Sequence, residues 1–173
     1  ARRLRGICEI GNELEFRLGD GLAVLNPSEA DALAITGMGG WSIVSMLKRE
    51  QRTAREAKRI VMQPMRGEEV LRAFLFSSGY DILDEKLVLD SGRIYQLICA
   101  ASGTPRPKPA GWPEAMYKIG WVMYNKRDPL FLSLVKKRLL ANERRLKNAP
   151  EAAENLRRET DCLIQLLRLM KEE

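Results

Sequence analysis

Glycines crowd one short stretch of the chain, at the point where an apolar run ends and a helical pattern begins. Gly37, Gly39 and Gly40 surround Met38, soon after the apolar run Leu33–Ile35. Glycine tolerates positive φ and lets another molecule approach the backbone. Such a turn could form one wall of a binding site for a flat aromatic ligand, although it matches neither the G-x-G-x-x-G pattern nor a P-loop. A plain tight turn is the alternative.

Two further turns carry glycine or polar residues at the expected ends of neighbouring strands. Asp20 and Gly21 follow the strand expected before the glycine turn. Gln63 and Pro64 end the strand expected after it. Ligands of open α/β sheets bind at the carboxyl ends of the strands, so the three turns could line one cleft. The simpler alternatives are that Asp20 caps the next helix, that Gln63 bridges backbone groups and that Met38 is a packing residue.

The chain contains no histidine, which excludes several kinds of catalysis. Ser-His-Asp and Cys-His mechanisms, histidine metal sites and a histidine general base all require that residue. Cys8, Cys99 and Cys162 are odd in number and far apart, so we expect neither a disulfide framework nor a zinc site. The expected location is the reducing cytoplasm, and no metal site is predicted. No apolar run reaches the ~18 residues of a membrane-spanning helix, so no membrane contact is predicted.

Residues 1–103 predict a partial Rossmann-like domain. Segments with strand character alternate with helical segments, and the last two strands flank Ser91-Gly92, a pair typical of tight hairpin turns. This order predicts the closing, C-terminal half of an open doubly wound α/β sheet that ends in an antiparallel hairpin. The expected strands are Glu13–Leu18, Asp31–Thr36, Arg59–Pro64, Asp81–Asp90 and Arg93–Ser102, and the expected helices are Gly19–Leu25, Gly40–Gln51 and Glu68–Tyr80.

The N-terminal end of the sequence has the pattern of a helix that closes on Gly11 and Asn12. Ala1 follows no methionine. We therefore expect the sequence to begin inside a larger domain, with the opening half of the sheet before it.

Beyond residue 103 the expected structure changes twice. Residues 104–127 predict a linker and packing segment. Its proline-rich part, up to Pro113, is expected to be extended. In the rest, which has no clear helix or strand pattern, Tyr117, Trp121 and Tyr124 are expected to pack the C-terminal appendage onto the sheet rather than stack on bases. Residues 128–173 predict two helices that meet near Pro150 and form an antiparallel, coiled-coil-like hairpin. The positions with heptad spacing are Leu132, Leu139 and Leu146 in the first helix and Leu156, Thr160, Leu163, Leu167 and Met170 in the second.

Positive charge is concentrated in this C-terminal part. Residues 1–102 carry no net charge, whereas residues 103–173 carry the whole excess of +6. A basic appendage on a neutral domain indicates a polyanionic partner such as RNA. The candidate RNA contacts are Lys136, Lys137, Arg144 and Arg145, because these pairs lie about two helical turns apart on one broad side of the first helix. An ordinary solvated helix surface is the alternative.

The motifs, taken in order, resemble one family. The stretches GDGL, ADALAITGMGG, IVMQPM and LRAFLFSSGYDILDEKLVLDSGRIYQLICAASG are similar to those of the bacterial tRNA (adenine(22)-N1)-methyltransferases, which are class I S-adenosylmethionine-dependent enzymes. The resemblance runs from about Gly19 to Gly103 at motif level, and more loosely to the C-terminus. The family also ends in a helical, coiled-coil-like appendage. The motifs are specific together, whereas no one of them is specific alone.

The resemblance implies a role for each turn. The acid–glycine pair would lie beside the adenine of the cofactor S-adenosylmethionine, the glycine turn would face the transferable methyl and the target base, and the Gln-Pro pair would contact the base. Met65 stands where relatives carry asparagine, which removes one polar contact. The implied catalytic residues are Gly37, Met38, Gly39, Gly40, Gln63 and Pro64, and the implied cofactor-binding residues are Asp20, Gly21 and Gly37.

The resemblance also implies an absence. The family's first glycine-rich loop and the acid after its second strand, which hold the methionine and ribose parts of the cofactor, have no counterpart in these 173 residues. We therefore expect the isolated chain to lack a complete cofactor site and to be inactive alone.

The predicted function is methyl transfer from S-adenosylmethionine to N1 of an adenine in tRNA, at position 22 by the resemblance. N1 has an in-plane lone pair and is neutral at pH 7, so it needs no base, and the site must chiefly position the reactants. One alternative is a non-catalytic RNA-binding protein that retains the α/β scaffold. The other is a coiled-coil interaction protein that dimerises, although a monomer is favoured.

Overall fold

The computed structural model describes residues 14–107, 117–148 and 153–172. The helix expected to close on Gly11 and Asn12, the helix start expected at Pro150, and Cys8 lie outside these residues. Within them, no helix is long and apolar enough to cross a membrane.

A sheet of four strands forms the centre of the structure. The strands are β1 (Ala32–Met38), β2 (Arg59–Pro64), β3 (Tyr80–Asp90) and β4 (Arg93–Ser102), in the order β1-β2-β4-β3. β1 and β2 are parallel, whereas β4 is antiparallel to both β2 and β3. This mixed sheet confirms the prediction of a Rossmann-like sheet that ends in an antiparallel hairpin.

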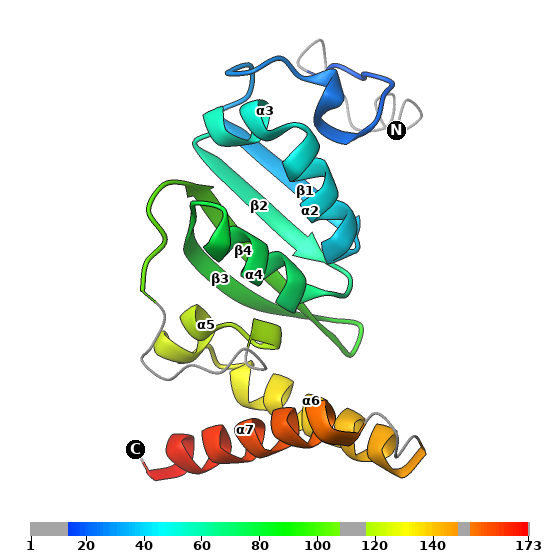
Figure 1. The fold of residues 1–173 in the computed structure, drawn as a ribbon, viewed down its shortest axis with the longest axis vertical. Helices are drawn as coiled ribbons and strands as arrows, with labels where there is room; N and C mark the ends of the chain where they lie inside the picture. Colours follow the sequence, from blue (N-terminus) through cyan, green and yellow to red (C-terminus); the bar gives the residue numbers. More distant parts are fainter. Residues whose placement is uncertain (1–13, 108–116, 149–152, 173) are drawn as a thin grey trace.

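Helices cover one face of the sheet. α2 (Gly40–Arg49), the short α3 (Gln51–Glu56) and α4 (Glu68–Ser77) lie on the same side in Figure 1. The predicted apolar face of α2 is buried, with Ile43 and Leu47 fully inaccessible to solvent. They belong to one apolar core with strand residues such as Ile60 and Met62. The helical prediction for this segment is therefore confirmed.

The β3–β4 connection is the predicted tight hairpin turn. Ser91 and Gly92 both have positive φ, at 47° and 75°, as a two-residue turn with the twist of the flanking strands requires. The two strands stay paired from Asp90–Arg93 to Tyr80–Ser102, with one irregularity between Ile82 and Asp84.

The strand expected at Glu13–Leu18 is wrong: residues 14–18 have no regular structure. Leu14 and Leu18 are 36% and 104% exposed, so the alternating pattern buries no apolar face. Arg17 instead holds the segment as a loop, donating to Glu15 at 2.8 Å and to the carbonyl of Val24 at 2.9 Å. An alternating pattern forms a strand only where a neighbouring edge supplies ladder hydrogen bonds, and no described strand pairs with it. The short helix expected next is present as η1 (Gly21–Val24).

Three further helices follow the sheet. α5 (Trp121–Asn125) lies against β3, and α6 (Phe131–Asn148) and α7 (Ala153–Glu172) run side by side as a helical hairpin below the sheet in Figure 1. A second apolar core joins them to β3 through Leu87, Phe131 and Leu163. The sheet and the hairpin therefore share a buried interface.

The aromatic residues between sheet and hairpin pack as predicted. Tyr117 and Trp121 are 7% and 4% exposed, belong to the core of the sheet, and meet edge to face with ring centroids 5.6 Å apart. Tyr124 packs against the second core. Tyr117 and Trp121 are therefore unavailable for stacking on bases, whereas Tyr124 is half-buried.

The burial pattern of α6 differs from the predicted heptads. Its most buried residues are Phe131, Leu134, Val135 and Asn142, whereas Leu132, Leu139 and Leu146 are only half-buried. α6 contacts both α7 and the body of the protein, so its apolar surface is wider than the seam of a two-helix coiled coil.

Candidate active site

The glycine turn begins with a bulge in β1. Thr36 pairs with Gln63 and Met38 pairs with Pro64, so Gly37 is an extra residue in the parallel ladder. Its φ is 74°, in the left-handed region where a side chain would be strained. The bulge turns the Gly37 N–H toward β2, where it donates to Oε1 of Gln63 at 3.3 Å. The backbone conformation at position 37 therefore requires glycine.

Gln63 links the two strand ends. Its Oε1 accepts from Gly37, and its Nε2 donates to the carbonyl oxygen of Pro64 at 3.1 Å and lies 3.7 Å from Sδ of Met65. Gln63 thus bridges backbone groups in this structure, which was the simpler of its two interpretations. A contact between Gln63 and a base remains a prediction.

Two backbone hydrogen bonds join the turn after β1 to the turn after β2. Met65 donates to the carbonyl of Met38, and Gly40 donates to the carbonyl of Arg66, both at 2.8 Å. A Cβ on Gly40 would overlap the carbonyl group of Gly67, so the two chains touch backbone to backbone there. Gly40 is a glycine because of this packing, and its predicted catalytic role is not needed to explain it.

Gly37 and Gly39 differ from Gly40 in what surrounds them. A Cβ at either position would meet no atom of the described residues within 4 Å. Gly39 has a φ of −73°, so its backbone would accept other residues without strain. The open space beside the turn therefore lies at Gly37 and Gly39, where a ligand could approach the backbone.

Two exposed apolar side chains flank this space. Trp41, the second residue of α2, is 72% exposed, and Met65, directly after β2, is 52% exposed. Position 67 lies close to the Trp41 ring, since a Cβ built there would be 3.7 Å from its Cδ1. Sequence analysis missed Trp41, although its place outside the apolar stripe of α2 was a usable signal.

The acid–glycine pair at residues 20–21 lies beside α2. Oδ2 of Asp20 forms an ion pair with Nη2 of Arg49 at 2.9 Å, and the Asp20 side chain is 78% exposed. Asp20 makes no side-chain capping bond to η1, so the capping alternative is wrong. Gly21 has a φ of 59°, and a Cβ there would lie 2.8 Å from Sδ of Met46. That space is filled by Met46, and contacts of Asp20 and Gly21 with a cofactor remain predictions.

The predicted RNA contacts all lie on α6 and are exposed. Lys136, Arg144 and Arg145 make no ion pair among the described residues, whereas Lys137 donates to the carbonyl of Gly92 at 3.3 Å. Their neighbour Arg138 points to the body and pairs with Glu68 at 3.3 Å. Most of the predicted set is therefore free to meet an anionic partner.

A separate hollow of about 430 Å³ lies where α5, α6 and α7 meet. Tyr124, Asn125 and Leu132 are among its lining residues, and none of the predicted site residues lines it. It is not the site formed by the strand ends.

The strand order and the turns at the carboxyl ends of β1 and β2 place this chain in the class of Rossmann-like methyltransferase folds. Solved structures support this class. The B. subtilis m1A22 tRNA methyltransferase TrmK superposes with a TM-score of 0.74 at 24% identity, covering 99% of this chain and 74% of that one. Sp1610 of Streptococcus pneumoniae, solved with S-adenosyl-L-methionine, has a TM-score of 0.74 at 22% identity over 87% of this chain and 67% of that one.

The sequence comparisons are more specific. The family model described as TrmK, tRNA (adenine(22)-N(1))-methyltransferase, matches residues 8–172, and the chain belongs to this family. The tRNA (adenine(22)-N(1))-methyltransferase of Bacillus subtilis strain 168 is 31% identical over 94 residues, which are 54% of this chain and 40% of that protein. The match thus spans less than half of the relative's length. The resemblance seen in the motifs is confirmed.

Proposed function

We propose that this chain forms the side of an active site at which a methyl group is transferred to N1 of an adenine in tRNA, at nucleotide 22. The observation that carries the proposal is the open backbone at Gly37 and Gly39, at the carboxyl end of β1 and beside the end of the parallel strand β2. Membership of the methyltransferase family supports the same reaction.

The cofactor of this proposal is S-adenosylmethionine, which supplies an electrophilic methyl group. The residues present fit one side of such a group. Gly37 and Gly39 leave the backbone unobstructed, and the exposed carboxylate of Asp20 can accept a hydrogen bond from an amino group. Asp20, Gly21 and Gly37 are the residues that would hold it, and a solved structural neighbour from Streptococcus pneumoniae is described in complex with it.

The chain's own task in this reaction is to place the base. N1 of adenine attacks through a lone pair that is free at pH 7, so no general base is required, which fits a sequence without histidine. The turn at residues 37–40, with Gln63 and Pro64, would form the wall behind the base. Trp41 and Met65 offer apolar surface at its margin for a base that has left the helical stack.

The helical hairpin would bind the rest of the tRNA. Lys136, Lys137, Arg144 and Arg145 are exposed on α6 and suit phosphate contacts, which set affinity and register rather than base choice. A coiled-coil-like appendage, a monomeric state and a cytoplasmic location complete the proposal. tRNA is the substrate that the name of the B. subtilis relative gives for that protein.

The test uses the protein expressed from its gene, an unmodified tRNA transcript and S-adenosylmethionine carrying a labelled methyl group. We expect label in the tRNA and a stop of reverse transcriptase at adenine 22, because N1 methylation blocks base pairing. A transcript with guanine at position 22 is the matched control and should stay unlabelled. Cofactor binding without label transfer, or tRNA binding without cofactor binding, would contradict the proposal, and the second result would indicate the non-catalytic RNA-binding alternative.

A further inference from the structure

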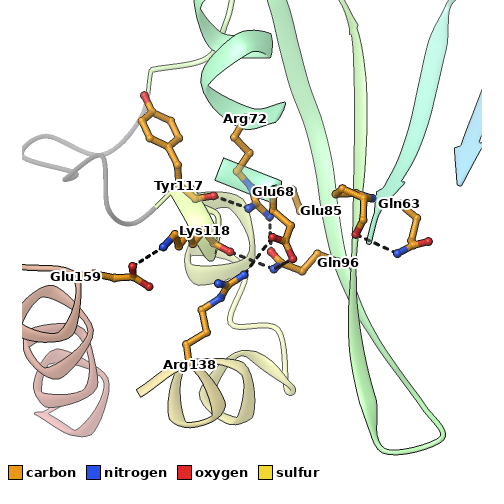
Figure 2. Close-up of polar contacts among 10 residues, drawn as sticks. Gln63, Glu68, Arg72, Glu85, Gln96, Tyr117, Lys118, Arg138 and Glu159 are labelled. Atoms are coloured by element: carbon orange, nitrogen blue, oxygen red, sulfur yellow. Dashed lines mark hydrogen bonds and ion pairs between the residues drawn. The ribbon is translucent and has the colours of Figure 1, made fainter. Parts of the chain in front are cut away.

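A buried arginine makes contacts with three other segments of the chain. Arg72 of α4 is fully buried and donates to Oε1 of Glu85 at 2.6 Å, to the carbonyl of Tyr117 at 2.5 Å and to Oε1 of Gln96 at 2.7 Å. Figure 2 shows these acceptors converging on its guanidinium. A Cβ on Gly120 would lie 2.5 Å from Oε2 of Glu85, so the chain before α5 also approaches closely.

Gln96 extends these contacts in two directions. Its Nε2 donates to Oε1 of Glu68 and to the carbonyl of Lys118, both at 3.1 Å. From Glu68 the path continues to Arg138 of α6, whose Nη2 lies 3.3 Å from Oε2. From Lys118 it continues to Glu159 of α7, whose Oε2 accepts from Nζ at 2.5 Å. Each helix of the hairpin is thus connected by one ion pair to a neighbour of Gln96 of β4: α6 to Glu68 of α4, and α7 to Lys118 before α5 (Figure 2).

These two ion pairs are poor candidates for stabilising the fold by themselves. Glu159 and Glu68 are 6% and 15% exposed as side chains, so both carboxylates lose most of their hydration. Nε of Arg138 is buried and has no hydrogen-bond partner in the part of the chain that the structure describes. The loss of hydration of the two charged groups offsets much of their mutual attraction. Replacing such a buried pair by well-packed apolar residues often leaves the stability of the fold unchanged or higher. A hydrogen-bonded network of this kind does, however, restrict the relative orientation of the elements it joins.

The position of Glu68 links this network to the candidate active site. Glu68 is the first residue of α4, directly after Gly67, and Gly67 is the residue that Gly40 contacts. Arg138 therefore ties α6 to a point one residue away from the joined turns. Lys136, two residues before Arg138 on the same helix, is exposed and belongs to the proposed RNA-binding set.

We infer that the ion pairs Arg138–Glu68 and Lys118–Glu159 are positioning contacts that hold the RNA-binding hairpin at a fixed distance from the glycine turn. This fixed distance selects which adenine of a bound tRNA reaches the site. The inference rests on the proposed function for its consequence, but the geometry itself can be measured without activity.

The test compares Arg138→Met and Glu68→Gln with a matched control, Arg158→Met. Arg158 pairs with Glu154 within α7, on a surface where both side chains are more than 70% exposed, and this pair does not reach the sheet. Gln at position 68 keeps an amide oxygen for Gln96, so the fold should survive. Thermal melting and S-adenosylmethionine affinity, measured on each variant, should match the unmodified protein.

We expect Arg138→Met and Glu68→Gln to lower kcat/KM for tRNA on the order of 100-fold, as small misplacements do. New reverse-transcriptase stops should appear beside the main one. The control Arg158→Met should retain the single stop. An unchanged stop pattern in Arg138→Met and Glu68→Gln overturns the inference.

Spin labels at Arg52→Cys on α3 and Leu140→Cys on α6 test the geometry alone, with the three native cysteines replaced by serine. Both positions are well exposed. Electron paramagnetic resonance should give a narrow distance distribution in the unmodified protein and in Arg158→Met, and a broad one in Arg138→Met. Equal widths in all three overturn the inference. If the unmodified protein methylates no tRNA, the proposed function fails, and the distances still decide whether the hairpin is held.

Discussion

Gly40, the first residue of α2, lies against the carbonyl group of Gly67, the residue that precedes α4. The contact leaves no room for a side chain at position 40 and joins the turns that follow two neighbouring strands. The open space beside Gly37 and Gly39 therefore lies next to two turns that are held tightly together. Such a rigid surrounding suits a site whose task is to position the reactants.

Gly40→Ala should destabilise the protein, because its methyl group would overlap the Gly67 carbonyl and neither backbone can move without losing the Gly40–Arg66 hydrogen bond. We expect a loss of about 1–3 kcal/mol in the free energy of unfolding, measured by urea denaturation. Gly39→Ala is the matched control, since its φ of −73° and open surroundings accept a methyl group. Equal losses in the two variants would show that the contact between the turns is unimportant.

Gly39→Val should abolish methyl transfer while leaving the melting temperature nearly unchanged. The valine side chain would occupy the open space that we assign to the base and the methyl group. Its effect does not come from backbone strain, because the positive φ of this turn is at Gly37 and not at Gly39. Turnover of tRNA and thermal unfolding are the two measurements. Normal turnover in Gly39→Val would mean that the turn is not part of the site.

Trp41→Ala should weaken the reaction with tRNA and leave cofactor affinity and stability unchanged. The ring is 72% exposed, so its removal costs little packing. Stacking of a base on an aromatic ring contributes about 1–3 kcal/mol, so kcat/KM should fall roughly 5- to 150-fold. Trp41→Phe should recover part of the loss, because it restores an aromatic face. A Trp41→Ala variant with unchanged kcat/KM for tRNA would exclude this contact.

Replacing Lys136, Lys137, Arg144 and Arg145 by glutamine should weaken tRNA binding and reduce its dependence on salt. The slope of log K against log salt should fall by roughly 0.7–0.9 for each phosphate that the variant no longer neutralises. Cofactor affinity should not change. Arg52→Gln with Lys58→Gln, two exposed cations on the sheet side of the protein, is the control and should keep the slope. A quadruple variant with an unchanged slope would place the RNA elsewhere, for example around Arg106, Lys126 and Arg127.

The ion pair between Asp84 and Lys126 makes a small part of the stability depend on pH. Nζ of Lys126 lies 2.7 Å from Oδ1 of Asp84. This hydrogen-bonded ion pair holds the pKa of the Asp84 carboxyl below its ordinary value. The pair therefore stabilises the fold above the unfolded pKa of ~4, and this contribution disappears as pH falls through the lower pKa of the folded state. Asp84 is 61% exposed, so the contribution is less than about 1 kcal/mol.

Asp84→Asn should accordingly lower the unfolding free energy slightly at pH 7, and the difference from the unmodified protein should vanish below the folded pKa. Chemical denaturation at a series of pH values measures it. Asp90→Asn, on the same strand and without an ion pair among the described residues, is the control. A difference that persists to pH 2 would point to a cause other than charge.

Much of the fold followed from local sequence patterns. The apolar run of β1, the amphipathic stripe of α2 and the Ser91-Gly92 turn each depend on residues near one another in the chain, and each is present. The motifs also placed the chain in its methyltransferase family, because the order of several short stretches is specific even where each stretch is not.

The tertiary structure decided what depends on distant partners. Residues 14–18 alternate like a strand but are a loop, because no described strand edge pairs with them. The three glycines of residues 37–40 look alike in sequence, yet Gly37 is required by a bulge against Gln63 and Gly40 by contact with Gly67. Arg72 looks in the sequence like one more charge on a helix, and it is buried because its acceptors come from positions 85, 96 and 117. Local propensity depends on residues that are neighbours in the sequence. Strand pairing, contacts between backbones and buried charge pairs form only when folding brings remote segments together.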